Sequence, residues 1–137
     1  MKKKESAVIA SLLDLPEFEP ETAAVKLPRL GIVLELKELP YDKLLSLSRE
    51  RDPDPHLILA CVTNHPELKQ PAWYHDKMGQ PTPVDALKKL LRKGEVRKIC
   101  QVIDVLHGYG VGSVVPCTEE ELQSRAISAA VEELEKN

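Results

Sequence analysis

The sequence predicts an α+β fold that is mainly α-helical: a compact helical domain with one small β-hairpin near the N-terminus and peripheral terminal helices. Three observations carry this prediction. Apolar residues recur at helical spacing over most of the chain beyond residue 40, period-two alternation marks the short segment 32–37, and proline or glycine separates the segments. The 137 residues fit one domain, and a composition with 42% hydrophobic but 4% aromatic residues requires a core built mainly from Leu, Val, Ile and Ala.

We expect three regions: an N-terminal helical arm and linker over residues 1–20, a core domain over 21–112, and a C-terminal helix within 113–137. Residues 6–15 carry a helical apolar stripe that Pro16 ends, and residues 16–21 (PEFEPE) form an acidic linker. This linker predicts that the first helix is a mobile arm. The sequence leaves open whether the arm docks on its own chain or is exchanged between subunits.

Two short strands are expected next, over residues 23–27 and 32–37. In the second strand every other residue, beginning with Ile32, is Ile or Leu. The intervening residues 28–31 (PRLG) form a turn in which Gly31 is free to take a positive φ. Because an isolated hairpin is marginally stable in water, one of its faces should pack on helices.

Helical periodicity and capping residues define the remaining elements. Asp54 is expected to cap a helix whose residues 57–62 (LILACV) are apolar all round, which predicts a central place in the core. Thr82 is expected to cap a second helix, and Thr118 with Glu121 forms a capping box before the last one. The expected helices are 40–51, one beginning near Pro55, a short turn within 70–78 ended by Gly79, 83–92, 95–107 ended by Gly108 and Gly110, and the C-terminal helix.

Charge and hydropathy argue against two classes of partner. A net charge of -3 provides no basic field for nucleic acid, and the basic start MKKKE is too short to follow a phosphate backbone. The longest apolar run, residues 57–62, falls far short of the ~20 residues that a membrane span needs. Residues 1–20 are not expected to act as a signal peptide, because Glu5 and Asp14 interrupt the apolar stretch.

The cysteines indicate a reducing compartment. Cys61, Cys100 and Cys117 are odd in number, and no pair of them has CxxC spacing. Reduced thiols, two of them on apolar faces, are therefore expected, as in a cytoplasmic protein.

No pattern in the chain predicts a catalytic, cofactor or metal site. The glycine-rich residues 108–112 (GYGVG) follow a helix rather than a strand, which indicates a helix C-terminus and not a phosphate loop. Residues 52–56 (DPDPH) have no second cluster at ligand spacing, so no metal is expected. Cys61 lies inside a fully apolar run, where a thiolate is disfavoured. We therefore expect a protein that is not an enzyme and that needs no cofactor.

Two features are candidates for binding a partner. Trp73 and Tyr74 are adjacent aromatics between loop residues, and they either pack on the core or anchor a partner. The C-terminal helix carries a narrow apolar stripe that either docks on the core or pairs with another helix. The residues of this stripe are Leu122, Ala126, Ala130 and Leu134.

The chain from Leu27 to Gly110 resembles the XkdN-like family of phage tail assembly chaperones, found in phages and prophages of Gram-positive bacteria. The resemblance is carried by KLPRLGIVLELKEL (26–39), LILACVTNHPELKQ (57–70) and DKMGQPTPVDALKKLLRKGEVRKICQVIDVLHGYG (76–110). Four motifs occur in the family's order. They are an Arg-Leu-Gly strand turn (29–31), an apolar helix followed by a proline loop (57–66), a Gly-x-x-Thr-Pro helix start (79–83), and a Leu-Leu-x-x-Gly-Glu junction (90–95).

The resemblance implies a protein of the host cytoplasm that binds the tape measure protein and keeps it soluble during tail assembly. Such proteins are absent from the mature virion and form homo-oligomers. Many are also made as a longer frameshifted form, of which this chain would be the short counterpart, and the tail tube protein is a further possible partner. The family has no catalytic residues to carry over. The alternative is a structural or completion protein that remains in the phage tail.

Overall fold

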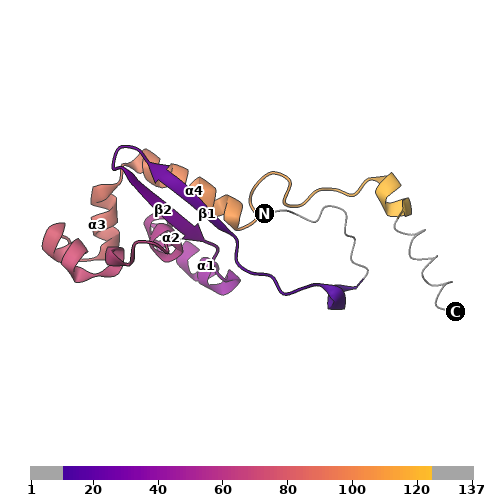
Figure 1. The fold of residues 1–137 in the computed structure, drawn as a ribbon, viewed down its shortest axis with the longest axis horizontal. Helices are drawn as coiled ribbons and strands as arrows, with labels where there is room; N and C mark the ends of the chain where they lie inside the picture. The colour runs from indigo at the N-terminus through magenta and orange to yellow at the C-terminus, as the bar shows by residue number, and fades with distance from the viewer. Residues whose placement is uncertain (1–10, 125–137) are drawn as a thin grey trace. The chain divides into compact units, whose positions relative to one another are not determined.

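The computed structural model describes residues 11–124, and within it Pro20–Ser113 form one compact unit of a hairpin and helices (Figure 1). The strands β1 (Thr22–Leu27) and β2 (Ile32–Lys37) pair antiparallel, in a register that places Leu27 opposite Ile32 at the turn. Gly31 takes a φ of 68°, the left-handed conformation that glycine adopts without a steric penalty. The expected hairpin is therefore confirmed, and with it the mainly helical α+β class.

The helices follow the hairpin in sequence. They are α1 (Tyr41–Ser48), α2 (Pro53–Cys61), α3 (Pro83–Leu90) and α4 (Lys93–Leu106), with the 3-10 turn η2 (Pro66–Lys69) and the π-helical segment η3 (Ala72–Lys77) between α2 and α3. Helix α2 contacts β2 and α4, and α4 contacts β1, so these two helices cover the inner face of the hairpin. Figure 1 shows α4 running alongside the two strands.

The core lies between the hairpin and these two helices. Ile58 and Cys61 in α2 and Ile103 in α4 have no exposed surface, and Leu36 in β2 is 1% exposed. In β2 the burial alternates as the period-two pattern requires. The central place expected for the LILACV helix is confirmed by its buried residues.

Two helices begin earlier than the sequence predicted. Asp54 is not the cap of α2, because Pro53 already fixes a helical φ and the helix starts there, with Asp52 at the N-cap position. Helix α4 begins at Lys93, so the expected break at residues 93–94 is its first turn. Glu95 there accepts a hydrogen bond from the Arg92 N–H at 2.8 Å, and this contact satisfies one of the free donors of the helix start.

Other boundaries agree with the capping residues. Thr82 Oγ1 accepts from the Asp85 N–H at 3.1 Å at the start of α3. Gly108, with a φ of 89°, follows the end of α4, whereas Gly110 does not have a positive φ. Thr118 and Glu121 bond to each other's backbone N–H at 3.1 and 2.8 Å, which confirms the capping box. Helices α1 and α3 end before the expected residues 51 and 92.

The expected helix over residues 6–15 is not continuous. Ser11 has an extended backbone, and its side chain caps the short 3-10 turn η1 (Leu12–Asp14) by accepting a hydrogen bond from the Leu13 N–H at 3.1 Å. Residues 6–10 lie outside the described residues. At the other end, residues 119–124 are helical, and Leu122 is 57% exposed. Ala126, Ala130 and Leu134 lie outside the described residues.

Candidate functional site

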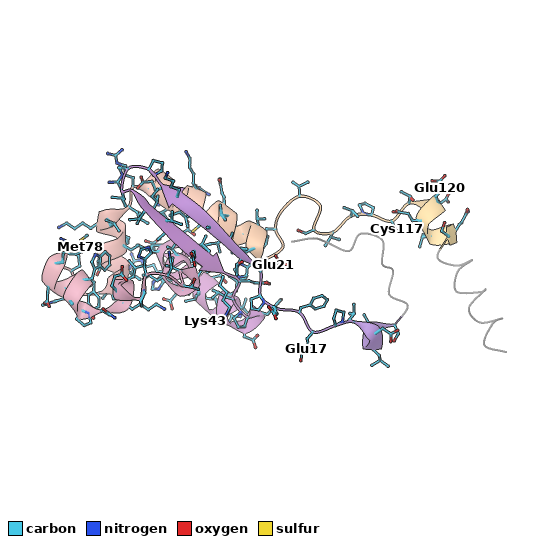
Figure 2. The ribbon with its side chains drawn as sticks, viewed as in Figure 1. Glu17, Glu21, Lys43, Met78, Cys117 and Glu120 are labelled. Atoms are coloured by element: carbon cyan, nitrogen blue, oxygen red, sulfur yellow. The ribbon has the colours of Figure 1, made fainter. Side chains whose placement is uncertain are left out.

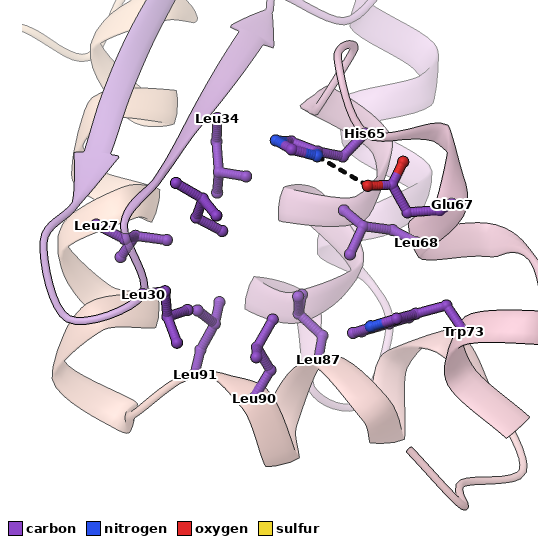
Figure 3. Close-up of a pocket in the computed structure, with 11 residues that line it drawn as sticks. Leu27, Leu30, Leu34, His65, Glu67, Leu68, Trp73, Leu87, Leu90 and Leu91 are labelled. Carbon is purple, nitrogen blue, oxygen red and sulfur yellow. Dashed lines mark hydrogen bonds and ion pairs between the residues drawn. The ribbon is translucent and has the colours of Figure 1, made fainter. Parts of the chain in front are cut away.

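An apolar groove of about 290 Å³ opens between the turn end of the hairpin and α3 (Figure 3). Its walls come from β1, β2 and the turn that joins them, from η2 and η3, and from the end of α3. The lining side chains are aliphatic apart from one indole and one polar pair. They are Leu27, Leu30, Ile32, Leu34, Leu68, Trp73, Leu87, Leu90 and Leu91, with His65 and Glu67.

Helix α3 supplies one wall of this groove through residues that recur at helical spacing. Leu87, Leu90 and Leu91 stand three and four residues apart, so they share one face of the helix end. The turn of the hairpin supplies the opposite wall with Leu30, which stays partly buried. The Gly31 N–H donates to the Leu27 carbonyl at 2.8 Å, and this bond holds the turn closed.

The bidentate pair of Arg29 and Glu95 fixes the distance between these two walls. Arg29 Nε and Nη2 donate to the two carboxylate oxygens of Glu95 at 2.9 and 2.7 Å. Arg29 Nη2 also donates to the Leu90 carbonyl at 2.8 Å. The hydrogen bond from Arg29 lowers the pKa of Glu95 to about 2, so the carboxylate stays ionised over the physiological range.

Trp73 forms one end of the groove, and Tyr74 does not line it. Trp73 is partly buried against the core, and Figure 3 shows its indole beside Leu68 and Leu87. Tyr74 is also partly buried, but neighbouring residues on a helix point in different directions. The segment η3 that holds both aromatics ends at Gly79, which has a φ of 67°. Of the two expected aromatics, the structure therefore brings one into the groove.

His65 and Glu67 form the polar corner of the groove. His65 Nδ1 lies 3.0 Å from Glu67 Oε2, and its Nε2 lies 2.9 Å from the Val33 carbonyl oxygen. Both ring nitrogens thus face acceptors, which favours the doubly protonated ring. The hydrogen bond to Glu67 and then the one to Val33 raise the pKa of His65, and His65 lowers the pKa of Glu67.

The lining of the groove contains no Cys, Ser, Thr or Lys side chain. Cys61 has no exposed surface, and burial raises the pKa of its thiol to about 11. Burial likewise raises the pKa of Cys100 to about 12. Cys117, labelled in Figure 2, is free and exposed, and it belongs to the segment beyond Ser113. The groove therefore offers an apolar surface with one polar corner.

A second depression, of about 190 Å³, is lined by side chains of both charges. It lies between the start of α2 and the α3–α4 junction, where Asp52 and Lys88 form an ion pair at 2.9 Å. The positive charge there comes from Lys88, Lys93 and Arg97, and the negative charge comes from Asp52 and Asp54. In residues 11–124 no three His, Cys, Asp or Glu residues are placed to hold a metal ion.

In the part that the structure describes, no helix has both the length and the apolar character needed to cross a membrane. Comparisons with protein-family models, with characterised proteins and with solved structures find no match.

Sequence reasoning found Trp73 but missed the groove. The signal present in the sequence was Leu30, a large apolar residue placed in the hairpin turn.

Proposed function

We propose that this protein is a phage tail assembly chaperone, which binds the tape measure protein and keeps it soluble while the tail assembles. One observation carries the proposal on the structural side: apart from the His65–Glu67 pair, the open groove is lined by aliphatic side chains and one indole. On the sequence side, the support is the order of four motifs shared with the XkdN-like chaperones.

The size of the groove suits a side chain better than a metabolite. At about 290 Å³ it lies at or below the ~300–1,000 Å³ typical of pockets for small molecules. A helix that lays its apolar face across a groove inserts a few such side chains. The tape measure protein is a long, mostly helical rod, so it would offer many apolar residues at helical spacing.

A chaperone that coats such a rod and must later leave it requires weak contacts that repeat along the rod. Burying one Leu or Phe side chain contributes about 1.5–3 kcal/mol before the costs of association are subtracted. One groove would therefore hold one site loosely, and many copies would be needed along the rod. Tail tube subunits, which polymerise around the same rod, could then displace each copy in turn.

Co-expression with the tape measure protein of the same genome tests this proposal. We expect the rod protein to become soluble and to co-purify with this chain. Trp73→Ala should reduce co-purification, because it removes one end of the groove. Tyr74→Ala is the matched control, since Tyr74 is the neighbouring aromatic and lies outside the lining. Far-UV circular dichroism of both variants shows whether they remain folded.

Two outcomes would count against the proposal. A rod that stays insoluble with the wild-type chain would favour a structural or completion protein, and finding the chain in purified virions would support that alternative. Equal losses for Trp73→Ala and Tyr74→Ala, with both variants folded, would move the binding surface away from the groove. The apolar stripe that begins at Leu122 would then be the next surface to test.

A further inference from the structure

The two edges of the hairpin differ in their hydrogen bonding. The outer edge of β2 is covered by the residues that follow α2: the Thr63 N–H donates to the Glu35 carbonyl at 2.9 Å. The side chain of Asn64 then continues the ladder in place of a strand. Its Oδ1 accepts from the Glu35 N–H at 2.9 Å, and its Nδ2 donates to the Val33 carbonyl at 3.0 Å. This edge is therefore closed to other chains.

In the part of the chain that the structure describes, the outer edge of β1 is open. Since Glu35 bonds outward, its partner Ala24 also points its N–H and C=O away from β2, because opposite residues in antiparallel strands alternate between bonded and non-bonded pairs. The bond from the Glu38 N–H to the Glu21 carbonyl at 2.8 Å confirms this alternation. Thr22 and Lys26 share the orientation of Ala24.

Within residues 11–124, the outward-pointing groups of Thr22, Ala24 and Lys26 have no hydrogen-bond partner, and all three residues are exposed. An edge of this kind is a template for pairing with another strand. A lysine on an edge discourages pairing when it meets a second lysine, so the pairing register decides whether the edge is usable.

We propose that β1 pairs antiparallel with β1 of a second copy of this chain, about a two-fold axis at Ala24, and joins two hairpins into a four-stranded sheet. This contact lies on a different surface from the groove and holds whether or not the protein is a chaperone. The second copy is the occupant because the edge is complementary to itself in one register.

The prolines on either side of the strand, Pro20 and Pro28, select this register. Outward-pointing residues must pair with one another. When Ala24 lies opposite Ala24 of the second copy, Thr22 lies opposite Lys26 of that copy. Three pairs then exchange about six backbone hydrogen bonds. A shift by one step in either direction brings Pro20 or Pro28, which has no N–H, into a pairing position.

The charges agree with the same register. It sets Lys26 opposite the neutral Thr22 of the second copy, whereas an axis at Lys26 would set two lysines against each other. The small side chain of Ala24 allows close approach at the centre. A contact between two six-residue strands buries less than the ~1,200 Å² of a stable interface, so a dimer with a Kd on the order of 100 μM is expected.

Sedimentation velocity of the full chain between about 5 and 500 μM, which brackets that Kd, should show a dimer fraction that rises with concentration. Ala24→Pro should abolish the dimer and leave the hairpin intact, because the Ala24 N–H points away from β2. A wild-type chain that remains monomeric throughout would overturn the proposal, and so would a dimer that a folded Ala24→Pro variant still forms.

Cysteine cross-linking provides a second test should Ala24→Pro fail to fold. In a Cys117→Ser background, which removes the exposed thiol, Ala24→Cys should form a disulfide-linked dimer on mild oxidation. Lys37→Cys is the matched control, because it is exposed on the same face of β2 but lies far from the axis. We expect Ala24→Cys to cross-link roughly tenfold faster, since its two copies come within disulfide distance. Equal rates would refute the two-fold contact.

Discussion

Replacing Ile103 with alanine tests whether α4 provides the centre of the core. Ile103 has no exposed surface, and it lies on the face of α4 that packs against the rest of the core. The substitution removes three carbon atoms, worth about 2.4 kcal/mol of transfer free energy at about 0.8 kcal/mol each. A cavity adds to this cost, and large-to-small changes of this kind destabilise proteins by about 2–5 kcal/mol.

Helix propensity opposes part of this loss, because alanine favours a helix over isoleucine by a few tenths of a kcal/mol, about 0.4. We therefore expect the free energy of unfolding to fall by about 2–4 kcal/mol. The whole stability of a domain this size is about 5–15 kcal/mol, so the variant should remain folded but unfold at a clearly lower urea concentration.

Val105→Ala is the matched control on the same helix. Val105 is 61% exposed, so its loss should change the free energy of unfolding by less than about 0.5 kcal/mol, or stabilise slightly through helix propensity. Urea titration followed by circular dichroism and by Trp73 fluorescence measures both variants. A cost below about 1 kcal/mol for Ile103→Ala, or similar costs for the two, would refute the packing of α4 described here.

Three further predictions concern polar contacts. Arg29 holds the pKa of Glu95 at about 2, below its ordinary 4.5. The pair therefore contributes stability above pH 4.5 that is lost as the pH falls toward 2. When the melting temperature is followed on acidification, Glu95→Gln should show a shallower decline than the wild type. The pKa of His65 lies above its ordinary 6.5, so its contacts stabilise the fold fully below pH 6.5 and weaken as the pH rises through the raised value. This pH dependence of stability should be absent from His65→Ala. An NMR titration of the wild-type ring that gave a pKa below 6.5 would contradict the pairing with Glu67. Thr82→Ala should cost about 1 kcal/mol in urea titration because the α3 cap is lost, whereas Thr82→Ser should cost much less; equal losses would show that the hydroxyl does not cap the helix.

The elements of this fold were predictable because their signals are local. Alternation of aliphatic residues set the second strand, and proline, threonine and glycine marked where helices start or stop. The errors at the helix starts have the same local origin. Asp54 stands before Pro55 just as Asp52 stands before Pro53, so two equivalent helix starts lie two residues apart. The earlier one prevails because its proline suits the first helical position equally well and lengthens α2 by two residues.

The groove was not predictable in the same way, because its walls come from segments that are far apart in sequence. Period and propensity show that Leu30 and Leu90 are apolar, but they do not show that the two residues face each other. Their separation is fixed by Arg29, which reaches a carboxylate 66 residues away. Trp73 was identifiable as a candidate by residue type alone, whereas its separation from Tyr74 depends on the geometry of η3.

A small set of polar contacts therefore determines where the hairpin lies. An alternating strand can bury its apolar face against any apolar helix, since hydrophobic burial has no direction. Hydrogen bonds do have direction, and several of them link the hairpin region to distant residues. Arg29 binds Glu95, Asn64 pairs with the β2 edge, and the Leu39 N–H donates to His107 Nε2 at 2.8 Å. The Leu39–His107 bond is partly buried, so removing one partner leaves the other without a hydrogen bond, and this contact discriminates against other placements of the same strands more strongly than it adds to stability.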